Sequence, residues 1–307
     1  MFNKICLTLL IVIILLITNI SMAIAEISPI WPLETNLIGL DYKYNIKSFS
    51  PYIGMAIGLD TGDIYKHLGT TITFEKVKFD INYGFWLNQG IPGYIDQTGI
   101  EGTMFYAFSP DQNIMISLFD GEVSSEEKEQ TSVDSIFIRY DQPLFNIHGW
   151  QLNIYSEITA GLAEQTEDAF FAHKLILPLK YNNFKIIPTF GTINQDDVIK
   201  PYYDLADFVR GYPEKNITGD QAVALTVEQQ YPLFLYSENP YLSSLQGVIF
   251  IDGGKVFKSN ENTKDIDIHS SVGAGLVLYL VKVDMGLVEA VTDEGDWGTL
   301  FYCKLTF

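Results

Sequence analysis

Hydrophobic and polar residues alternate along most of the chain after residue 34. Residues 77–85 show this clearly, with apolar or aromatic side chains at every second position: Val77, Phe79, Ile81, Tyr83 and Phe85. Residues 152–159 and 281–287 repeat the scheme, with polar residues or glycine in between. A period of two residues is that of a β-strand with one apolar and one polar face. The pattern therefore predicts an all-β protein.

A soluble β-sandwich would show the same alternation, but three features favour a transmembrane β-barrel. The polar faces carry charged residues and glycines, as expected of a hydrated lumen. The segments are about ten residues long, which is the length that a tilted strand needs to cross a bilayer. Aromatic residues gather near strand ends, in residues 83–87 and 295–302, where an aromatic girdle would lie. Because open sheet edges are costly in a bilayer, we predict a closed antiparallel barrel.

The alternation predicts fifteen strands. They cover residues 36–45, 50–59, 69–76, 77–86, 98–107, 113–122, 132–142, 149–160, 170–180, 183–193, 220–232, 246–257, 268–280, 281–291 and 297–307. Closed single-chain bacterial barrels have an even number of strands, so we expect one more, which makes about sixteen.

The N-terminus has the pattern of a secretory signal peptide. After a single lysine, residues 5–17 are almost wholly apolar, and the small-residue pattern Ala23-Ile24-Ala25 precedes Glu26. An uncleaved membrane anchor is the alternative, because the apolar run nearly reaches spanning length. We expect residues 1–25 to be a signal peptide and residues 26–307 to form one barrel domain in the bacterial outer membrane.

Composition and charge narrow the function classes. The chain has 38 acidic and 19 basic residues, a formal net charge of −19, which argues against a nucleic-acid partner. The acidic surplus lies between strands, in solvated loops that could also bind cations bridging lipopolysaccharide. No serine lies in a nucleophile-elbow context, so we expect neither an enzyme nor a cofactor. We also expect no metal site, because the four histidines are scattered without ligand spacing: His67, His148, His173 and His269.

One loop arginine stands out. Residues 207–220 read DFVRGYPEKNITGD, and Arg210 lies there in a chain with few basic residues. In the next two strands, Glu228 and Asp252 fall on the polar faces. An arginine exposed on a surface loop would make ion pairs worth little. Inside a lumen it must be paired, and its planar fork suits two carboxylates.

These residues also resemble the signature motifs of the Omp85 superfamily, which comprises barrel-assembly proteins, two-partner secretion transporters and D15-type surface antigens. The resemblance implies that an extracellular loop after the eleventh of sixteen strands folds back into the barrel, with five strands after it, and that Arg210 binds Glu228 and Asp252. A C-terminal phenylalanine implies an assembly signal. The matching residues are Val209, Arg210, Gly211 and Tyr212 in the loop, Glu228, then Phe250, Asp252 and Gly254 as F-x-D-x-G, and the final Phe307.

The resemblance implies a barrel that inserts or moves protein or lipid at the outer membrane. Residues 26–34 are too few for the POTRA domains that precede the barrel in this superfamily, so we expect none, and a separate periplasmic protein or a secreted client as partner alongside outer-membrane lipid and lipopolysaccharide. A seam that can open is expected between strands 36–45 and 297–307, where Gly39 and Gly298 weaken pairing. The alternative is a passive porin-like channel, with residues 200–219 as its constriction.

Overall fold

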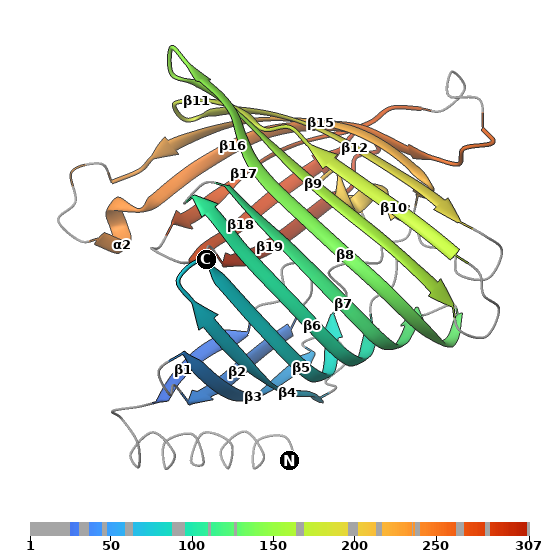
Figure 1. Cartoon of the computed structure of the whole chain (residues 1–307). Coiled ribbons are helices and arrows are strands. Elements are labelled where there is room, and N and C mark those ends of the chain that lie inside the picture. Colours follow the sequence, from blue (N-terminus) through green and yellow to red (C-terminus); the bar gives the residue numbers. More distant parts are fainter. Residues whose placement is uncertain are drawn as a thin grey trace, which may run out of the picture.

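The computed structural model describes the strands and many of their connections (Figure 1). The described residues are 25–30, 37–44, 48–58, 64–87, 96–109, 112–125, 128–163, 169–195, 202–212, 217–234, 236, 240–261, 267–279 and 283–305. The predicted signal peptide up to residue 24 and the C-terminal Phe307 lie outside these residues.

Nearly all described residues are in β-strands. The first eleven strands in the chain are β1 (Ala25–Ile30), β2 (Leu37–Tyr44), β3 (Phe49–Gly58), β4 (Ile64–Phe74), β5 (Val77–Leu87), β6 (Asp96–Ser109), β7 (Gln112–Ser125), β8 (Lys128–Ile147), β9 (Trp150–Ala163), β10 (Ala169–Ile176) and β11 (Leu179–Tyr181). The remaining elements are β12 (Phe184–Gln195), β13 (Tyr203–Asp204), η1 (Leu205–Asp207), β14 (Thr218–Gly219), β15 (Gln221–Pro232), α2 (Pro240–Ser243), β16 (Leu245–Phe257), β17 (His269–Tyr279), β18 (Val283–Thr292) and β19 (Trp297–Leu305).

The long strands form one antiparallel meander, in which each strand pairs with the next along the chain from β1 to β19. The sheet has 17 strands, but β10 and β11 both pair with β9 and β12 and so share one position, which leaves sixteen in the described part. The strand β12 is the eleventh of these, and five strands follow the arginine loop, in agreement with the predicted order.

The sixteenth strand is β1, which the sequence pattern missed. It pairs with β2 from Ala25↔Tyr44 to Ile30↔Gly39. Pro29 argues against a strand, because it has no N–H to donate, but proline is tolerated on an edge strand, and β1 is at one end of the described meander. The predicted seam is therefore corrected: the end strands are β1 and β19, and Gly39 lies on the second strand.

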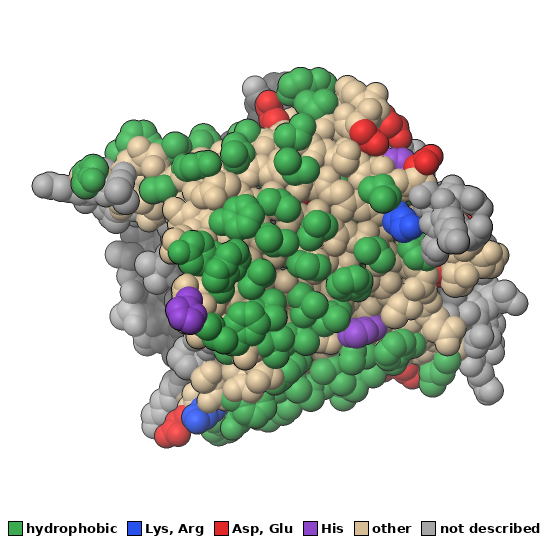
Figure 2. Space-filling view, turned by 90° about the horizontal axis from the view of Figure 1, so that it is seen from above, with side chains coloured by type: hydrophobic (Ala, Val, Ile, Leu, Met, Phe, Trp, Pro, Cys, Tyr) green, Lys and Arg blue, Asp and Glu red, His purple; other side chains and the backbone are tan. Residues whose placement is uncertain are grey.

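The apolar face of the sheet points outward. On β16, Ile249 and Ile251 are exposed while Phe250 and Asp252, which alternate with them, are buried, and on β5 Ile81 is exposed while Asn82 is buried. Figure 2 shows hydrophobic side chains gathered over one outer face, with charged side chains toward its margins. An exposed apolar face of this extent requires a nonaqueous surrounding.

The sheet curls round so that β17–β19 lie behind β6–β8 in Figure 1. Polar and charged side chains such as Asp80, Glu101 and Asp252 thus face the inside of the curl, on the side opposite to the exposed apolar residues. Among the described residues no helix is both long enough and apolar enough to span a bilayer. The architecture is that of a β-barrel with an apolar exterior and a polar lumen.

Candidate functional site

The loop between β12 and β15 has its own local structure. Its two ends pair in the short hairpin β13–β14, through Tyr203↔Gly219 and Asp204↔Thr218. Between them the one-turn helix η1 is capped at its N-terminus by Asp204, whose side chain accepts a hydrogen bond from the Ala206 N–H (3.0 Å). The side chain of Asp207 accepts one in return from the Asp204 N–H (3.2 Å). This reciprocal cap fixes the start of the turn that presents Arg210.

Apolar side chains seat the loop against the inner wall. The Tyr203 ring packs closely against Gly191 of β12. Any larger residue there would collide with it, since a Cβ at Gly191 would lie 2.6 Å from the ring. The Tyr203 hydroxyl donates to the His173 carbonyl (3.0 Å). The loop contributes five buried residues to one apolar cluster, and the wall contributes small or branched ones: Tyr203, Leu205, Phe208, Val209 and Tyr212, with Ala172, Ile193, Ala222, Ala224 and Val256. Burial of this set holds the loop on the side of the lumen formed by β10, β12, β15 and β16.

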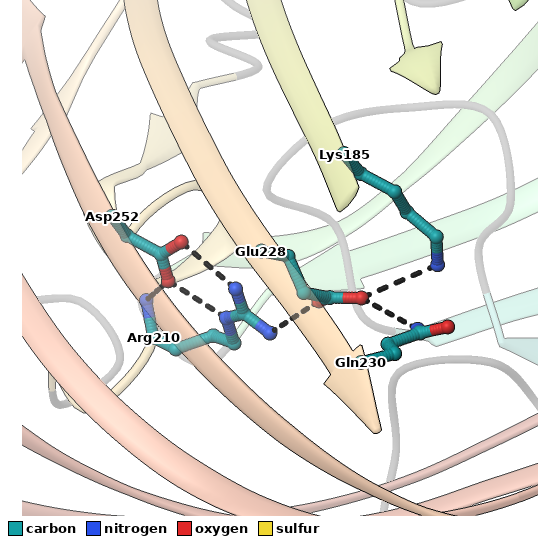
Figure 3. A network of polar contacts seen from close by, with 5 residues as sticks. All are labelled: Lys185, Arg210, Glu228, Gln230 and Asp252. Carbon is teal, nitrogen blue, oxygen red and sulfur yellow. Dashed lines mark hydrogen bonds and ion pairs between the residues drawn. The ribbon is translucent and has the colours of Figure 1, made fainter. Parts of the chain in front are cut away.

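Arg210 makes the predicted contacts with both carboxylates (Figure 3). Its Nε lies 2.7 Å from Asp252 Oδ2 and its Nη2 lies 2.9 Å from Asp252 Oδ1, which is a bidentate pair. Its backbone N–H also donates to Asp252 Oδ2 (3.2 Å), and its Nη1 donates to Glu228 Oε2 (3.3 Å). Asp252 is fully buried. Charge-assisted bonds of this kind are the strong ones, and the bidentate geometry also fixes the orientation of the loop.

Two further residues complete the network, and the sequence motifs gave no indication of either. Lys185 Nζ lies 3.2 Å from Glu228 Oε1, and Gln230 Nε2 donates to the same oxygen (2.7 Å; Figure 3). Lys185 and Glu228 are direct cross-strand partners on β12 and β15. With Arg210 and Asp252, the network holds two positive and two negative groups, so the charges balance inside the lumen.

Aromatic and glycine residues of the motifs position the arginine. The guanidinium carbon of Arg210 lies 3.4 Å from the centroid of the Phe250 ring, which is buried. This is a cation–π contact. A Cβ at Gly254 would lie 3.2 Å from Val209 Cγ2 and 2.9 Å from Ala224 Cβ, so glycine leaves room there for the loop.

Gly211 turns the chain directly after the arginine. Its φ is +95°, a conformation that favours glycine. A Cβ at Gly211 would lie 2.8 Å from the Ala290 Cβ on β18. On β19, a Cβ at Gly298 would lie 2.6 Å from the Gly211 Cα, so the loop backbone rests against the backbone of the last strand.

Tyr212 fastens the loop to the ends of β17 and β18. Its hydroxyl donates to Asp293 and lies 3.1 Å from His269 Nδ1, and the two rings meet edge to face at 5.4 Å. Burial and the hydrogen bond to Asp293 raise the pKa of Tyr212. Burial by itself would raise the pKa of Asp293, but the hydrogen bonds from Tyr212 and from the Ser270 N–H outweigh it and lower that pKa.

The structure thus brings together every predicted site residue that it describes: Val209, Arg210, Gly211, Tyr212, Glu228, Phe250, Asp252 and Gly254. Phe307 lies outside the described residues. Burial alone would lower the pKa of Arg210, but Asp252 and Glu228 outweigh burial and raise it. The arginine therefore stays charged, and the arrangement can hold a segment of chain in the lumen.

Comparison with known proteins identifies the fold. No protein-family model matches the chain, and no curated protein matches it. The solved structure of BamA from Haemophilus ducreyi lacking POTRA domains 1–3 is similar with a TM-score of 0.57 and 11% identity, over 91% of this chain and 70% of that one. CdiB from Escherichia coli gives 0.59 and 11% over 92% and 61%, and CdiB from Acinetobacter baumannii gives 0.53 and 11% over 92% and 66%.

The class of protein follows from these likenesses. The chain has the fold of the bacterial outer-membrane β-barrels to which BamA and CdiB belong, in agreement with the predicted fold class and location. It spans 61–70% of the length of those chains. At 11% identity the likeness concerns the fold.

Proposed function

We propose that the chain is an outer-membrane barrel of the Omp85 type that inserts or translocates protein at the outer membrane. The observation that carries this proposal is the bidentate Arg210–Asp252 pair, formed inside the lumen by a loop that follows the eleventh strand. The likeness in fold to BamA and CdiB supports it. Lipid is the other cargo class that the same barrel would suit.

The proposed role is mechanical rather than catalytic. The carboxylates of Asp252 and Glu228 are both occupied by ion pairs, so neither is available as a general base. What the network does is hold a loop inside the lumen in a defined position, where the loop narrows the passage through the barrel. A lipase assay on the purified barrel, compared with buffer, tests the absence of hydrolytic activity.

The proposed partners are a separate periplasmic protein or a secreted client, with outer-membrane lipid around the barrel. Clients would approach from the side of the short turns, of which residues 182–183 between β11 and β12 are one. A photocrosslinking amino acid at Asn183 in intact cells should capture a polypeptide. A partner is contradicted if crosslinked products are the same in cells that carry the amino acid on the outward, exposed side chain of Ile251.

Arg210→Ala tests the function directly. We expect loss of client insertion or secretion in cells, because the loop loses its side-chain bonds to both carboxylates. Arg139→Ala is the matched control: Arg139 pairs with Asp141 (3.2 Å) and Glu157 (3.7 Å) on the strands β8 and β9, and not with the two carboxylates that bind Arg210. Equal loss in both variants would contradict a specific role of the loop.

Conductance in planar bilayers separates this function from a passive porin-like channel with residues 200–219 as its constriction. For the proposed function, the unmodified barrel should pass little current, and Arg210→Ala should open it. A large, steady current in the unmodified protein that Arg210→Ala leaves unchanged would support the channel instead.

A further inference from the structure

A buried serine on β17 lies beside the carboxylate that anchors the arginine loop. Ser271 is directly across from Asp252 in the pairing of β16 with β17, so both side chains face the lumen. Direct cross-strand neighbours have Cβ atoms about 4.5–5.5 Å apart, which lets a hydroxyl reach a carboxylate. Ser271 is only 4% exposed, yet its Oγ has no hydrogen-bond partner within the described part of the chain.

The arginine loop occupies the positions around this serine. On β16, Arg210 binds Asp252 with its side chain and with its backbone N–H (Figure 3). On β17 itself, the Tyr212 hydroxyl and ring contact His269, two residues before Ser271. Ser271 therefore lies on the patch of wall against which Arg210 and Tyr212 are held.

While the loop is in place, the Asp252 carboxylate is taken up by the arginine. The hydrogen bonds that Asp252 accepts from the described residues all come from Arg210, two on Oδ2 and one on Oδ1. The bidentate pair fixes the orientation of the carboxylate toward the guanidinium, and the Ser271 hydroxyl is left without an acceptor. A buried hydroxyl without a partner bears its full desolvation cost and requires an explanation.

We propose that Ser271 makes the anchored loop releasable. When the loop withdraws, the Asp252 carboxylate loses its guanidinium, and the Ser271 hydroxyl can rotate about χ1 and donate a charge-assisted hydrogen bond to it. The serine thus destabilises the anchored state, in which it is unpaired, and stabilises the withdrawn state, in which it binds Asp252. Both effects oppose the four hydrogen bonds by which Arg210 holds the loop.

A second buried serine of the lumen wall provides a comparison. Ser117 on β7 is also 4% exposed, but its Oγ lies 2.6 Å from Thr103 Oγ1, so these two hydroxyls satisfy each other. Burial on this wall therefore does not by itself leave a serine unpaired. The inference concerns the loop and the wall alone, so it does not depend on the function proposed above.

Proteolysis of the loop in the full chain, purified and folded in detergent, tests the proposal. When the loop moves faster than it is cut, the rate of cleavage within residues 202–219 follows the population of the withdrawn loop. Ser271→Ala removes the unpaired hydroxyl and the donor that replaces Arg210. We expect cleavage to slow by about 5–100-fold, which corresponds to the penalty on a buried unpaired polar group. Ser117→Ala is the matched control and should leave the rate unchanged.

The Arg210→Ala background provides a second measurement. There the Ser271 hydroxyl already binds Asp252, so Ser271→Ala should lower the denaturant midpoint of the barrel. In the unmodified chain the same substitution should raise the midpoint or leave it unchanged. Retention of folded mobility on unheated gels shows that each variant is intact, and if the Arg210→Ala variants do not fold, the cleavage rates decide.

Three results would overturn the proposal. The first is unchanged or faster cleavage in Ser271→Ala. The second is an equal slowing in Ser117→Ala, which would make the effect a general one of buried hydroxyls. The third is the same shift of the denaturant midpoint in both backgrounds, because Ser271 would then act independently of Arg210.

Discussion

Asp252 is the residue on which the position of the loop depends most, because it is fully buried and accepts three of the four hydrogen bonds that Arg210 donates. Asp252→Ala leaves the guanidinium without its main partner inside the lumen. We expect a loss of about 3–5 kcal/mol in the free energy of unfolding, the usual cost of breaking a buried pair. Denaturant titration of the barrel in detergent measures it.

Lys185→Met provides the comparison for Asp252→Ala. The lysine also binds a carboxylate of the network, but without it Glu228 still binds Arg210 and Gln230, so we expect a smaller loss of stability than for Asp252→Ala. An equal loss of stability in both variants would contradict the dominant role of Asp252. The double variant Arg210→Met, Asp252→Leu should recover part of the loss, because no uncompensated charge remains.

Substitutions at Gly211 and Gly295 separate the backbone strain of a positive φ from steric contact with the barrel wall. Both have a positive φ, of +95° and +88°. A Cβ at Gly211 would press on Ala290, while a Cβ at Gly295 would meet open space. Gly295→Ala should therefore destabilise by the conformational term alone, about 1–2 kcal/mol, and Gly211→Ala by clearly more. Unfolding midpoints of the two variants, measured side by side, check this; similar values would mean that Gly211 does not press on the wall.

At the level of the elements, the contacts by which Tyr212 attaches the loop to the ends of β17 and β18 should depend on pH. The pKa of Asp293 is lowered in the folded protein, so its contribution to stability is present above about pH 4 and is lost as the pH falls further. The pKa of Tyr212 is raised, so its contribution is complete below about pH 10 and is lost as the pH rises beyond the folded value. Protease cleavage within residues 202–219 should accelerate at both extremes.

Tyr212→Phe is the control for this pH dependence. It keeps the ring against His269 but removes the hydroxyl that binds Asp293. Cleavage of the loop should then be faster at neutral pH and should change less on acidification. An unchanged acid response in Tyr212→Phe would assign the effect to other carboxylates.

The sequence predicts elements and motif contacts well, because both depend on local patterns. The alternation predicts that Glu228 and Asp252 lie on the polar faces of their strands, and the resemblance predicts that both bind Arg210. The strand β1 was missed because Pro29 opposes a strand unless its edge position is known. Lys185 was missed because its proximity to Glu228 depends on the register between strands, which alternation does not specify.

For the whole molecule, the fold predicts which segments face the outside of the cell. The resemblance of its motifs implies that the loop that carries Arg210 is extracellular, and Ser259 lies beside the end of this loop, because the Ser259 N–H donates to Asp220 (2.7 Å). Asn182 lies at the other end of the strands, in the turn before β12. In a Cys303→Ser background, a membrane-impermeant thiol reagent on intact cells should label Ser259→Cys and leave Asn182→Cys unlabelled. The reverse labelling would mean that the barrel has the opposite orientation in the membrane.

The contact of Gly211 with Gly298 has a consequence for how this sequence can change. No side chain separates the loop from β19 at that point. A substitution at either glycine therefore displaces the other backbone, and the two positions, 87 residues apart in the chain, are expected to covary among homologues. Homologues with a larger residue at one of the two positions should carry a compensating change close to the contact. Examples are glycine in place of Ala290 or a different turn after Arg210.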